Sequence, residues 1–200
     1  APGGTERVRG PGTRAAPDVP REGFPETRPS IRHFAGLPVS SEALATACRL
    51  AQLAPSACNR QGGRAHCFND PALVRQIIGL QPGNRGFGDS AGAVIVVTGD
   101  IRSYAEAGER RQALIDASLF AMTLVYALHA QGLGTCMLAW CVAPDVDDTM
   151  RAAARLEDSE EIAMLIAVGH LPESLNVPVS TRYGAHEIAT LNLAPMDPAA

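Results

Sequence analysis

Two guanidinium groups and a hydroxyl alternate in RPSIRHF, residues 28 to 34, as Arg28, Ser30 and Arg32. Pro29 biases the residue before it towards an extended backbone, and alternate side chains of an extended segment project to one side. Arginine binds anions with paired charge-assisted hydrogen bonds, so this face could hold a terminal phosphate. The alternative is that both arginines are ordinary solvated surface groups.

A second polar cluster lies in LAPSACNRQGG, residues 53 to 63, where a proline stops an apolar helical run. Ser56, Asn59, Arg60 and Gln61 fall within six positions, just before two glycines. Polar side chains gathered at a sharp turn indicate either a loop that caps its own backbone or a loop that binds a ligand.

A third pattern, GDSAG at residues 88 to 92, matches the G-x-S-x-G motif of serine hydrolases and centres on Ser90. In that motif a strand precedes the serine and a helix follows it. Here a glycine-rich loop precedes Ser90 and a strand-like run follows it, so a Ser90 hydrolase is only an alternative. The glycines of this region do not have the spacing of a dinucleotide fingerprint either.

The composition narrows the chemistry further. All seventeen basic residues are arginine, so a lysine Schiff base and a phosphate-loop lysine are both excluded. A formal net charge of -4 gives no reason to expect nucleic acid or a membrane surface as a partner, and a small molecule is the better expectation. The five cysteines contain no CxxC pair, and they predict reduced thiols in a cytoplasmic protein without a metal site.

The hydrophobic pattern predicts the elements that must position these groups. Apolar residues at helical spacing, with serines before them, predict a helix from Ser40 to Ala54 that Pro55 ends. Runs of β-branched residues predict buried strands. The further predicted elements are a strand at 65–68, a helix at 70–78, a strand at 91–99, a helix at 106–131, a strand after it, a helix at 144–156 and a strand at 161–170.

Residues 1–29 carry six prolines and five glycines with almost no large apolar groups. Such a segment buries too little to offset the entropy of ordering. We therefore expect a flexible tail over residues 1–27 and a single domain over residues 28–200. Helices mixed with a few buried strands predict an α+β or α/β three-layer domain.

The run from 117 to 144 contains no Asp, Glu or Arg, so a membrane span has to be considered. Polar residues and glycines interrupt it after residue 130, which leaves fewer than the roughly twenty residues that a bilayer requires. A helix buried on nearly all sides is the better interpretation. One small chain covers such a helix poorly, which favours a homodimer.

Together the segments follow an order that resembles the nitroreductase family of flavin enzymes. These segments are RPSIRHF, a helix, APSACNRQ, a buried helix ending in GLGTCMLAW, IAMLIAVGHLPES and PVSTR, over about residues 28 to 190. The resemblance implies an α+β, nitroreductase-like three-layer fold with a mixed central sheet wrapped by helices. It also implies an intertwined homodimer that binds FMN at the dimer interface.

The resemblance assigns the flavin site to three groups of residues. The first group would hold the phosphate and the flavin edge, the second would reach over the flavin from the partner subunit, and the third would border the ring. In that order they are Arg28, Ser30, Arg32 and Arg182; Pro55, Ser56, Asn59 and Gln61; and Asn84, Asp116, Met137, Leu138, Ala139 and Trp140.

The sequence also departs from the family pattern. Ser180 stands where the family often has a basic residue, and Gly62 and Gly63 stand where a proline and a tryptophan are common. The two glycines predict extra space in the substrate pocket. Trp140, the sole tryptophan, would either stack near the ring or fill a gap in the core.

The resemblance implies a ping-pong oxidoreductase that passes hydride from NADH or NADPH through FMN to a small acceptor such as a nitro compound or quinone. FMN would carry the chemistry, so no catalytic side chain is expected. A flavin dehydrogenase or oxidase that tailors a metabolite shares every motif and stays open. So does a non-catalytic flavin-binding protein.

Overall fold

Four strands form the central sheet of the computed structural model, which describes residues 5–9 and 23–195. Their order is β2-β3-β5-β4, and each neighbouring pair is antiparallel. The inner strands β3 (Ala93–Asp100) and β5 (Glu160–His170) are rich in apolar residues and mostly buried, as expected of strands covered on both faces. The edge strands are β2 (Gly63–Phe68) and β4 (Leu133–Ala139).

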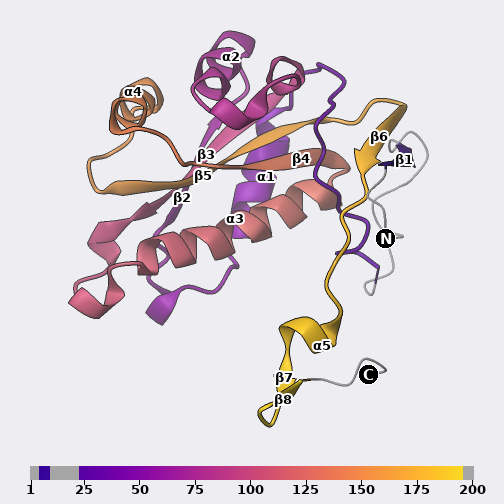
Figure 1. Ribbon diagram of the computed structural model, residues 1–200. Coiled ribbons are helices and arrows are strands. Elements are labelled where there is room, and N and C mark those ends of the chain that lie inside the picture. Colours follow the sequence, from indigo (N-terminus) through magenta and orange to yellow (C-terminus); the bar gives the residue numbers. More distant parts are fainter. Residues whose placement is uncertain (1–4, 10–22, 196–200) are drawn as a thin grey trace.

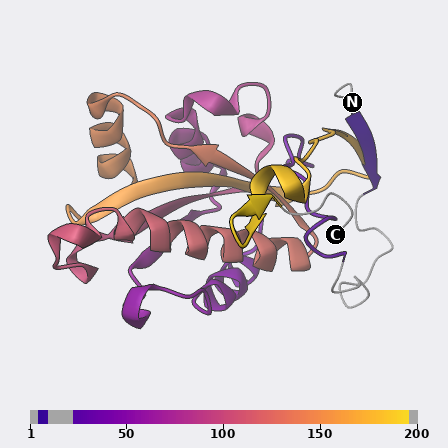
Figure 2. The same ribbon diagram turned by 60° about the horizontal axis from the view of Figure 1, so that its bottom comes forward.

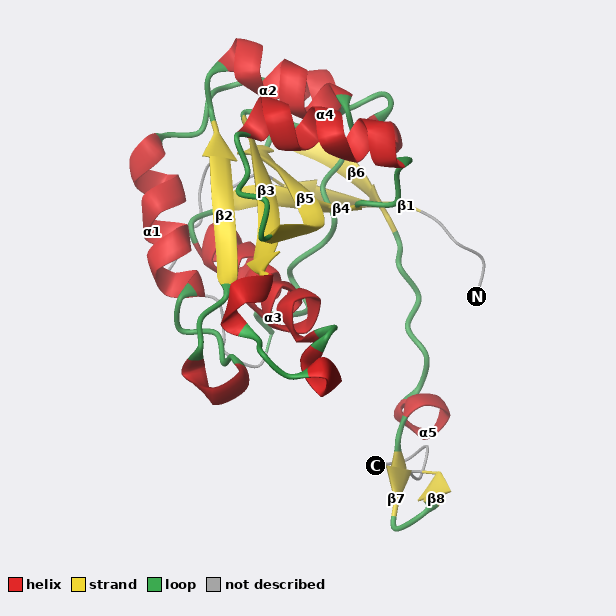
Figure 3. Cartoon of the chain, turned by 90° about the vertical axis from the view of Figure 1, so that its left-hand side faces the viewer, coloured by secondary structure: helices red, strands yellow, loops and turns green. Residues whose placement is uncertain are grey.

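A helical layer covers each face of this sheet (Figures 1 and 3). Helices α2 (Pro71–Gly79) and α4 (Pro144–Ala154) pack on one face, and α1 (Ser41–Ala51) and α3 (Gln112–Ala130) pack on the other. Alternate residues of β3 enter the two cores, Val94 and Val96 on the α2 side and Ile95 and Val97 on the α1 side. The predicted three-layer α+β architecture is therefore confirmed.

Local signals account for the helix ends. Ser40 caps α1 by accepting from the Ala43 N–H, and Asp70 caps α2 by accepting from two N–H groups, as N-cap residues do. The long helix begins at Gln112, later than the predicted start at 106. The reason is that Glu106 caps a separate 3₁₀ turn, Ala107–Glu109.

Ser30 and Ile31 lie along the outer edge of β4. Ser30 makes an isolated parallel bridge with Thr135, and the Ile31 N–H donates to the Thr135 carbonyl at 2.8 Å. The strands of the central sheet are antiparallel throughout, so the parallel component of the expected mixed sheet is this bridge.

A strand near the N-terminus pairs with a strand late in the chain to form a small second sheet. Strand β1 (Thr5–Arg9) pairs antiparallel with β6 (Ser174–Pro178). Within the tail predicted over residues 1–27, residues 5–9 thus form a strand, and residues 1–4 and 10–22 lie outside the described part. Beyond β6, the helix α5 (Ala185–Ile188) and the strands β7 (Thr190–Leu191) and β8 (Ala194–Pro195) project away from the body (Figure 1).

Helix α3 is long and apolar enough to span a membrane by length and composition alone, with a mean hydropathy of 1.6. It lies along the sheet, with α1 beside it (Figure 2), and half of its apolar window is buried. That burial is typical of a core helix. On its outer side, Ile115 and Leu119 are exposed, and Met122 and Tyr126 are half-buried.

Candidate functional site

The polar loop after α1 borders a hollow of about 250 Å³ that is open to solvent. The hollow lies where the end of α1, the start of β2 and the first half of α3 come together. It is lined by Ala51, Gln52, Ala54, Pro55, Ser56, Gln61, Gly63, Asp116 and Phe120. Four predicted site residues, Pro55, Ser56, Gln61 and Asp116, are therefore brought together in one place.

The backbone of this loop is unusual. Cys58, Asn59 and Gln61 all have φ values between 52° and 55°, a region that non-glycine residues enter only at some cost. Ser56 helps to hold this shape, because its Oγ accepts from the Gln61 N–H at 2.9 Å. Ser56 thus caps the loop, as one of the sequence alternatives proposed, while its side chain still lines the hollow.

Asp116 ties this loop to α3. Its buried carboxylate accepts from the Ala57 N–H at 2.9 Å, from the Tyr104 hydroxyl at 2.7 Å and from Gln112 Nε2 at 2.8 Å. Burial raises the pKa of Tyr104, and the bond to Asp116 raises it further, so Tyr104 remains a donor. Asp116 therefore positions the loop. The one sequence signal for this role was a carboxylate on an apolar helix.

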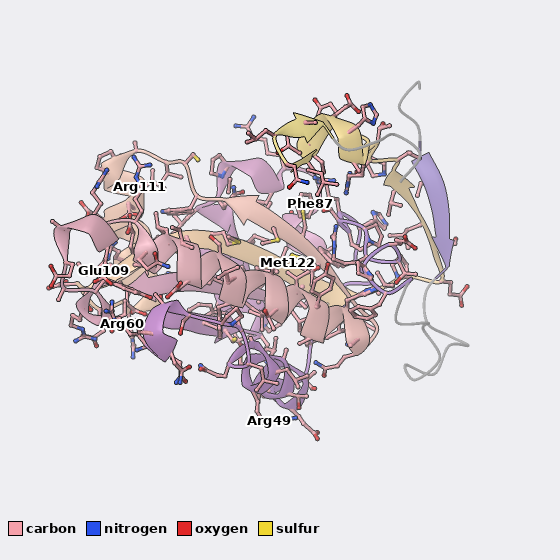
Figure 4. All side chains as sticks on the ribbon, turned by 90° about the horizontal axis from the view of Figure 1, so that it is seen from below. Arg49, Arg60, Phe87, Glu109, Arg111 and Met122 are labelled. Carbon is pink, nitrogen blue, oxygen red and sulfur yellow. The ribbon has the colours of Figure 1, made fainter. Side chains whose placement is uncertain are left out.

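Arg60 lies at the end of the molecule where Glu109 also lies (Figure 4). Its guanidinium pairs with Glu109 at 2.5 Å and stands 5.6 Å from the centre of the Tyr104 ring. Asn59 is exposed, and its carbonyl accepts from the Gln61 side chain. Arg60 thus links the loop to the segment before α3, on the exposed side of the loop.

The space expected at Gly62 and Gly63 is already filled, so that prediction was wrong. A Cβ at Gly62 would stand 2.8 Å from the Tyr104 hydroxyl, and a Cβ at Gly63 would stand 3.0 Å from Phe120. The glycines are required because Tyr104 and Phe120 pack against the backbone there. Tyr104 and Phe120 are distant from the two glycines in sequence, so the local sequence pattern could not show that their side chains fill this space.

The two arginines of RPSIRHF stand beside β4. Ser30, between the two arginines, bridges Thr135 of this strand. Burial raises the pKa of the Cys136 thiol in β4, and the guanidinium charges of Arg32 and Arg28 partly oppose that rise. Neither has a hydrogen-bond or ion-pair partner among the described residues. Two cations close together with no neutralising carboxylate are suited to an anion.

The end of β4 presents an open face. Met137 and Ala139 are exposed, while Leu138 between them is buried. Met137 pairs with Ile166 and Ala139 with Met164, both on the sheet face that α1 and α3 cover elsewhere. The helices leave this end of β4 uncovered, so a planar ligand could lie against it.

Trp140 turns to the other face. Its indole N–H donates to Asp147 of α4 at 2.7 Å, and the ring packs against the core on the α2 and α4 side. Of the two alternatives, the structure supports the filled core gap.

Asn84 is engaged within the chain. Its side-chain amide donates to the Ile78 carbonyl at 2.7 Å and to the carbonyl of Gln81. Gln81 is buried and donates to the Ala139 carbonyl at 2.9 Å. Sequence reasoning missed Gln81, which ties the 3₁₀ turn Pro82–Asn84 to the end of β4; its place before a Pro-Gly pair was the sole signal.

Arg182 lies on the exposed segment between β6 and α5. Among the described residues it donates only to its own neighbours, the carbonyls of Ser180 and Thr181. A single chain therefore does not bring Arg182 into contact with the other predicted phosphate ligands.

The predicted site residues form two groups at opposite edges of the sheet. The loop group adjoins β2, and the arginine group adjoins β4, with β3 and β5 between them. Three inter-strand spacings separate these edges by about 14 Å. One chain alone cannot close both groups around one small ligand.

The Ser90 alternative is not supported. Ser90 ends the 3₁₀ turn Gly88–Ser90 and precedes β3, the reverse of the strand–serine–helix order. Its hydroxyl donates to the Phe87 carbonyl at 2.8 Å, and no histidine bonds to it among the described residues. Within the same ranges no cluster of three His, Cys, Asp or Glu could hold a metal ion.

Comparisons with known proteins agree with this fold. Residues 79–170 match the model of the Nitroreductase family. An FMN-dependent nitroreductase from Clostridium difficile superposes with a TM-score of 0.70 at 20% identity, covering 86% of this chain and 98% of its own. A nitroreductase family protein from Streptococcus pneumoniae gives a TM-score of 0.71 at 23% identity, over 86% and 99% of the two chains.

A third structure, from Clostridium acetobutylicum and provisionally named an NADH oxidase, gives a TM-score of 0.70 at 21% identity, over 83% of this chain and 97% of its own. No curated protein sequence matches the chain. The solved structures therefore establish the shared fold, and the family match covers the stretch from the end of α2 to the end of β5.

Proposed function

We propose that this chain is an FMN-dependent oxidoreductase of the nitroreductase family, because residues 79–170 match the model of that family and the fold is shared with solved nitroreductase structures. Hydride would pass from NADH or NADPH to FMN and then to a small organic acceptor such as a nitro compound or a quinone. The observation that carries the proposal is the pair of arginines beside β4, Arg28 and Arg32, whose guanidinium groups have no hydrogen-bond or ion-pair partner among the described residues.

The residues at the β4 edge fit an FMN phosphate and ring. Arg28 and Arg32 would bind the dianionic phosphate, each by charge-assisted hydrogen bonds, with Ser30 as a further donor. The open face at Met137 and Ala139 would support the flat ring, and Gln81 would fix the end of the strand that borders it. When bound, FMN supplies the hydride acceptor and donor.

A homodimer is part of this proposal, because the loop group and the arginine group stand at opposite edges of one sheet. A two-fold axis that places the β2 edge of one subunit beside the β4 edge of the other would close two identical sites. Pro55, Ser56 and Asn59 of one subunit would then cover the ligand held by the other. The exposed apolar stripe on α3 offers a surface for that contact.

The protein would be cytoplasmic, in keeping with its five free cysteines. The residues near the ligand would act by binding, by orienting and by excluding water, and none is needed to move a proton.

Retention of FMN tests the proposal. The purified protein should be yellow or should bind added FMN with quenching of flavin fluorescence, and a colourless protein that takes up no FMN would overturn the proposal. Arg28→Ala and Arg182→Ala should each weaken binding by about tenfold or more, since a charge-assisted hydrogen bond contributes about 1.5 to 3 kcal/mol. Arg75→Ala, on the exposed side of α2, is the matched control and should bind FMN as the wild type does.

Anaerobic mixing with NADH or NADPH then tests the direction of transfer. Loss of flavin absorbance with either nucleotide, and its return when a quinone or nitro compound is added, is the expected result. An FMN-loaded protein that neither nucleotide reduces would instead support an oxidase that takes electrons from another metabolite.

A further inference from the structure

Two thiols touch where α1 meets the edge of the sheet. Cys48 lies near the end of α1 and Cys67 lies in β2, and their sulfur atoms are 3.8 Å apart. Both side chains are half-buried and border the same apolar core. The other three cysteines make no contact with this pair among the described residues.

The pair brackets the polar loop. Cys48 precedes the loop of residues 53 to 63 in the chain, and Cys67 follows it. This loop carries Ser56 and the strained positions Cys58, Asn59 and Gln61. The two sulfurs thus meet between α1, three residues before its end, and β2, four residues after its start. A bond between them would tether the two elements from which the loop emerges.

We propose that Cys48 and Cys67 form a reversible disulfide when the protein meets hydrogen peroxide, and that this bond stiffens the loop of residues 53 to 63. The sulfurs need to approach by about 1.8 Å to reach bonding distance. Both side chains are only half-buried, so they can rotate towards each other.

The two thiols have distinct roles in this reaction. The hydrogen bond from Cys67 lowers the pKa of Cys48 to about 7, whereas that bond and burial raise the pKa of Cys67. Cys48 is therefore the thiolate that attacks a peroxide, since the thiolate is the nucleophile.

The reaction balances in two steps. The Cys48 thiolate attacks one peroxide oxygen, the O–O bond breaks, and with one proton taken up the products are a Cys48 sulfenic acid and water. The Cys67 sulfur then attacks the Cys48 sulfur, and the hydroxyl leaves with the Cys67 proton as a second water. Two thiols are oxidised to one disulfide, and one peroxide is reduced to two waters; a dithiol reductant reverses the change.

Peptide mapping of the full-length wild type tests the bond directly. After peroxide treatment, free thiols are blocked with N-ethylmaleimide and the protein is digested with trypsin, which cleaves after arginine. Cys48, Cys58 and Cys67 fall in separate peptides, 33–49, 50–60 and 65–75. The expected product joins peptides 33–49 and 65–75 with the loss of two hydrogen atoms, and it disappears with dithiothreitol.

Matched variants separate the roles. Cys67→Ser should leave a Cys48 sulfenic acid that dimedone traps, and Cys48→Ser should leave Cys67 reduced. Cys141→Ser, which changes an exposed cysteine outside the pair, should form the same cross-link as the wild type. A variant that fails to fold does not decide the matter, because the wild-type map stands by itself.

Hydrogen exchange reports on the loop. In the oxidised protein, the backbone amides of residues 53 to 62 should exchange at about one third of their rate in the reduced protein, or more slowly still. Reduction should restore the original exchange rates. An effect on flavin binding would rest on the proposed function, whereas the cross-link and the exchange rates do not. A peptide map in which Cys58 is a partner in the cross-link, or in which N-ethylmaleimide has blocked every thiol, overturns the proposed disulfide. Unchanged hydrogen-exchange rates in the cross-linked protein overturn the proposed stiffening of the loop.

Discussion

Asp116 shows how one buried side chain can organise a binding loop. It accepts hydrogen bonds from a loop amide, from a tyrosine on the segment before α3 and from a glutamine one turn earlier on α3. Three donors converge on one carboxylate, and each would lose its partner if the carboxylate were removed. The resemblance places this residue beside the flavin, and its contacts within the chain give it a positioning role.

Replacing Asp116 by alanine should destabilise the protein. The Ala57 N–H and the Tyr104 hydroxyl would lose their acceptor, which we expect to lower the free energy of unfolding by about 2 to 3 kcal/mol. The urea midpoint measures the change. Asp148→Ala, an exposed position on α4, is the control, and equal midpoints for the two variants would contradict the role assigned to Asp116.

Gly63 gives a second test at the residue scale. Gly63→Ala brings a methyl group to 3.0 Å from Phe120, and overpacking of this kind costs about 1 to 3 kcal/mol. Gly108→Ala, where no atom lies within 4 Å, should change the thermal midpoint little. If Gly63→Ala is as stable as Gly108→Ala, the space next to Gly63 is not filled by Phe120.

At the scale of elements, two buried carboxylates lie at the ends of the inner strands, whereas the middle residues of these strands belong to the apolar core. Asp100 ends β3 and is buried, and it accepts two hydrogen bonds from the Arg102 guanidinium, at 3.0 and 2.9 Å. Glu160 begins the neighbouring strand β5 and accepts from Thr98 and from His66. These carboxylates anchor the end of the sheet nearest to the loop, because the Asp100 N–H also donates to the Gly62 carbonyl.

Acid should loosen this end of the sheet. The hydrogen bonds from Arg102 hold the pKa of Asp100 at about 2, below the value near 3.9 of an unfolded chain. The lowered pKa stabilises the fold above about pH 4, and that stabilisation is lost as the pH falls towards 2. Thermal midpoints measured across this range should fall less steeply for Asp100→Asn than for the wild type; parallel curves would show that another carboxylate dominates.

At the scale of the whole molecule, the two halves of the candidate site lie at opposite edges of the central sheet. The loop group stands at the β2 edge and the arginine group at the β4 edge. The outer side of α3 is apolar, with Ile115 50% and Leu119 43% exposed. Figure 4 looks onto this side of the helix, with Met122 near its middle.

A charge on α3 should therefore separate the proposed dimer. Leu119→Glu buries a carboxylate if a partner covers this stripe, and sedimentation should then show monomers that also lose FMN. Leu73→Glu changes a leucine of equal exposure, 42%, on the outer side of α2 and should leave the assembly intact. A Leu119→Glu protein that sediments as the wild type does would place the interface elsewhere.

The sequence alone determined the elements, because their signals are local. A serine before an apolar helical run, a proline that ends it, and unbroken β-branched runs act through neighbours in the chain. For that reason α1, α2, α4 and the buried strands β3 and β5 lie close to their predicted positions. The order of the motifs likewise predicted a resemblance to the nitroreductase family, and residues 79–170 match the model of that family.

Only the tertiary structure decided how the polar residues are used, because their partners are distant in sequence. It turned Trp140 to Asp147, engaged Asn84 within the chain, and filled the space beside Gly62 and Gly63 with Tyr104 and Phe120. It also separated the loop from the arginines by two strands. A chemical group carries the same sequence signal whether it binds a ligand or a neighbour, and packing alone decides between them.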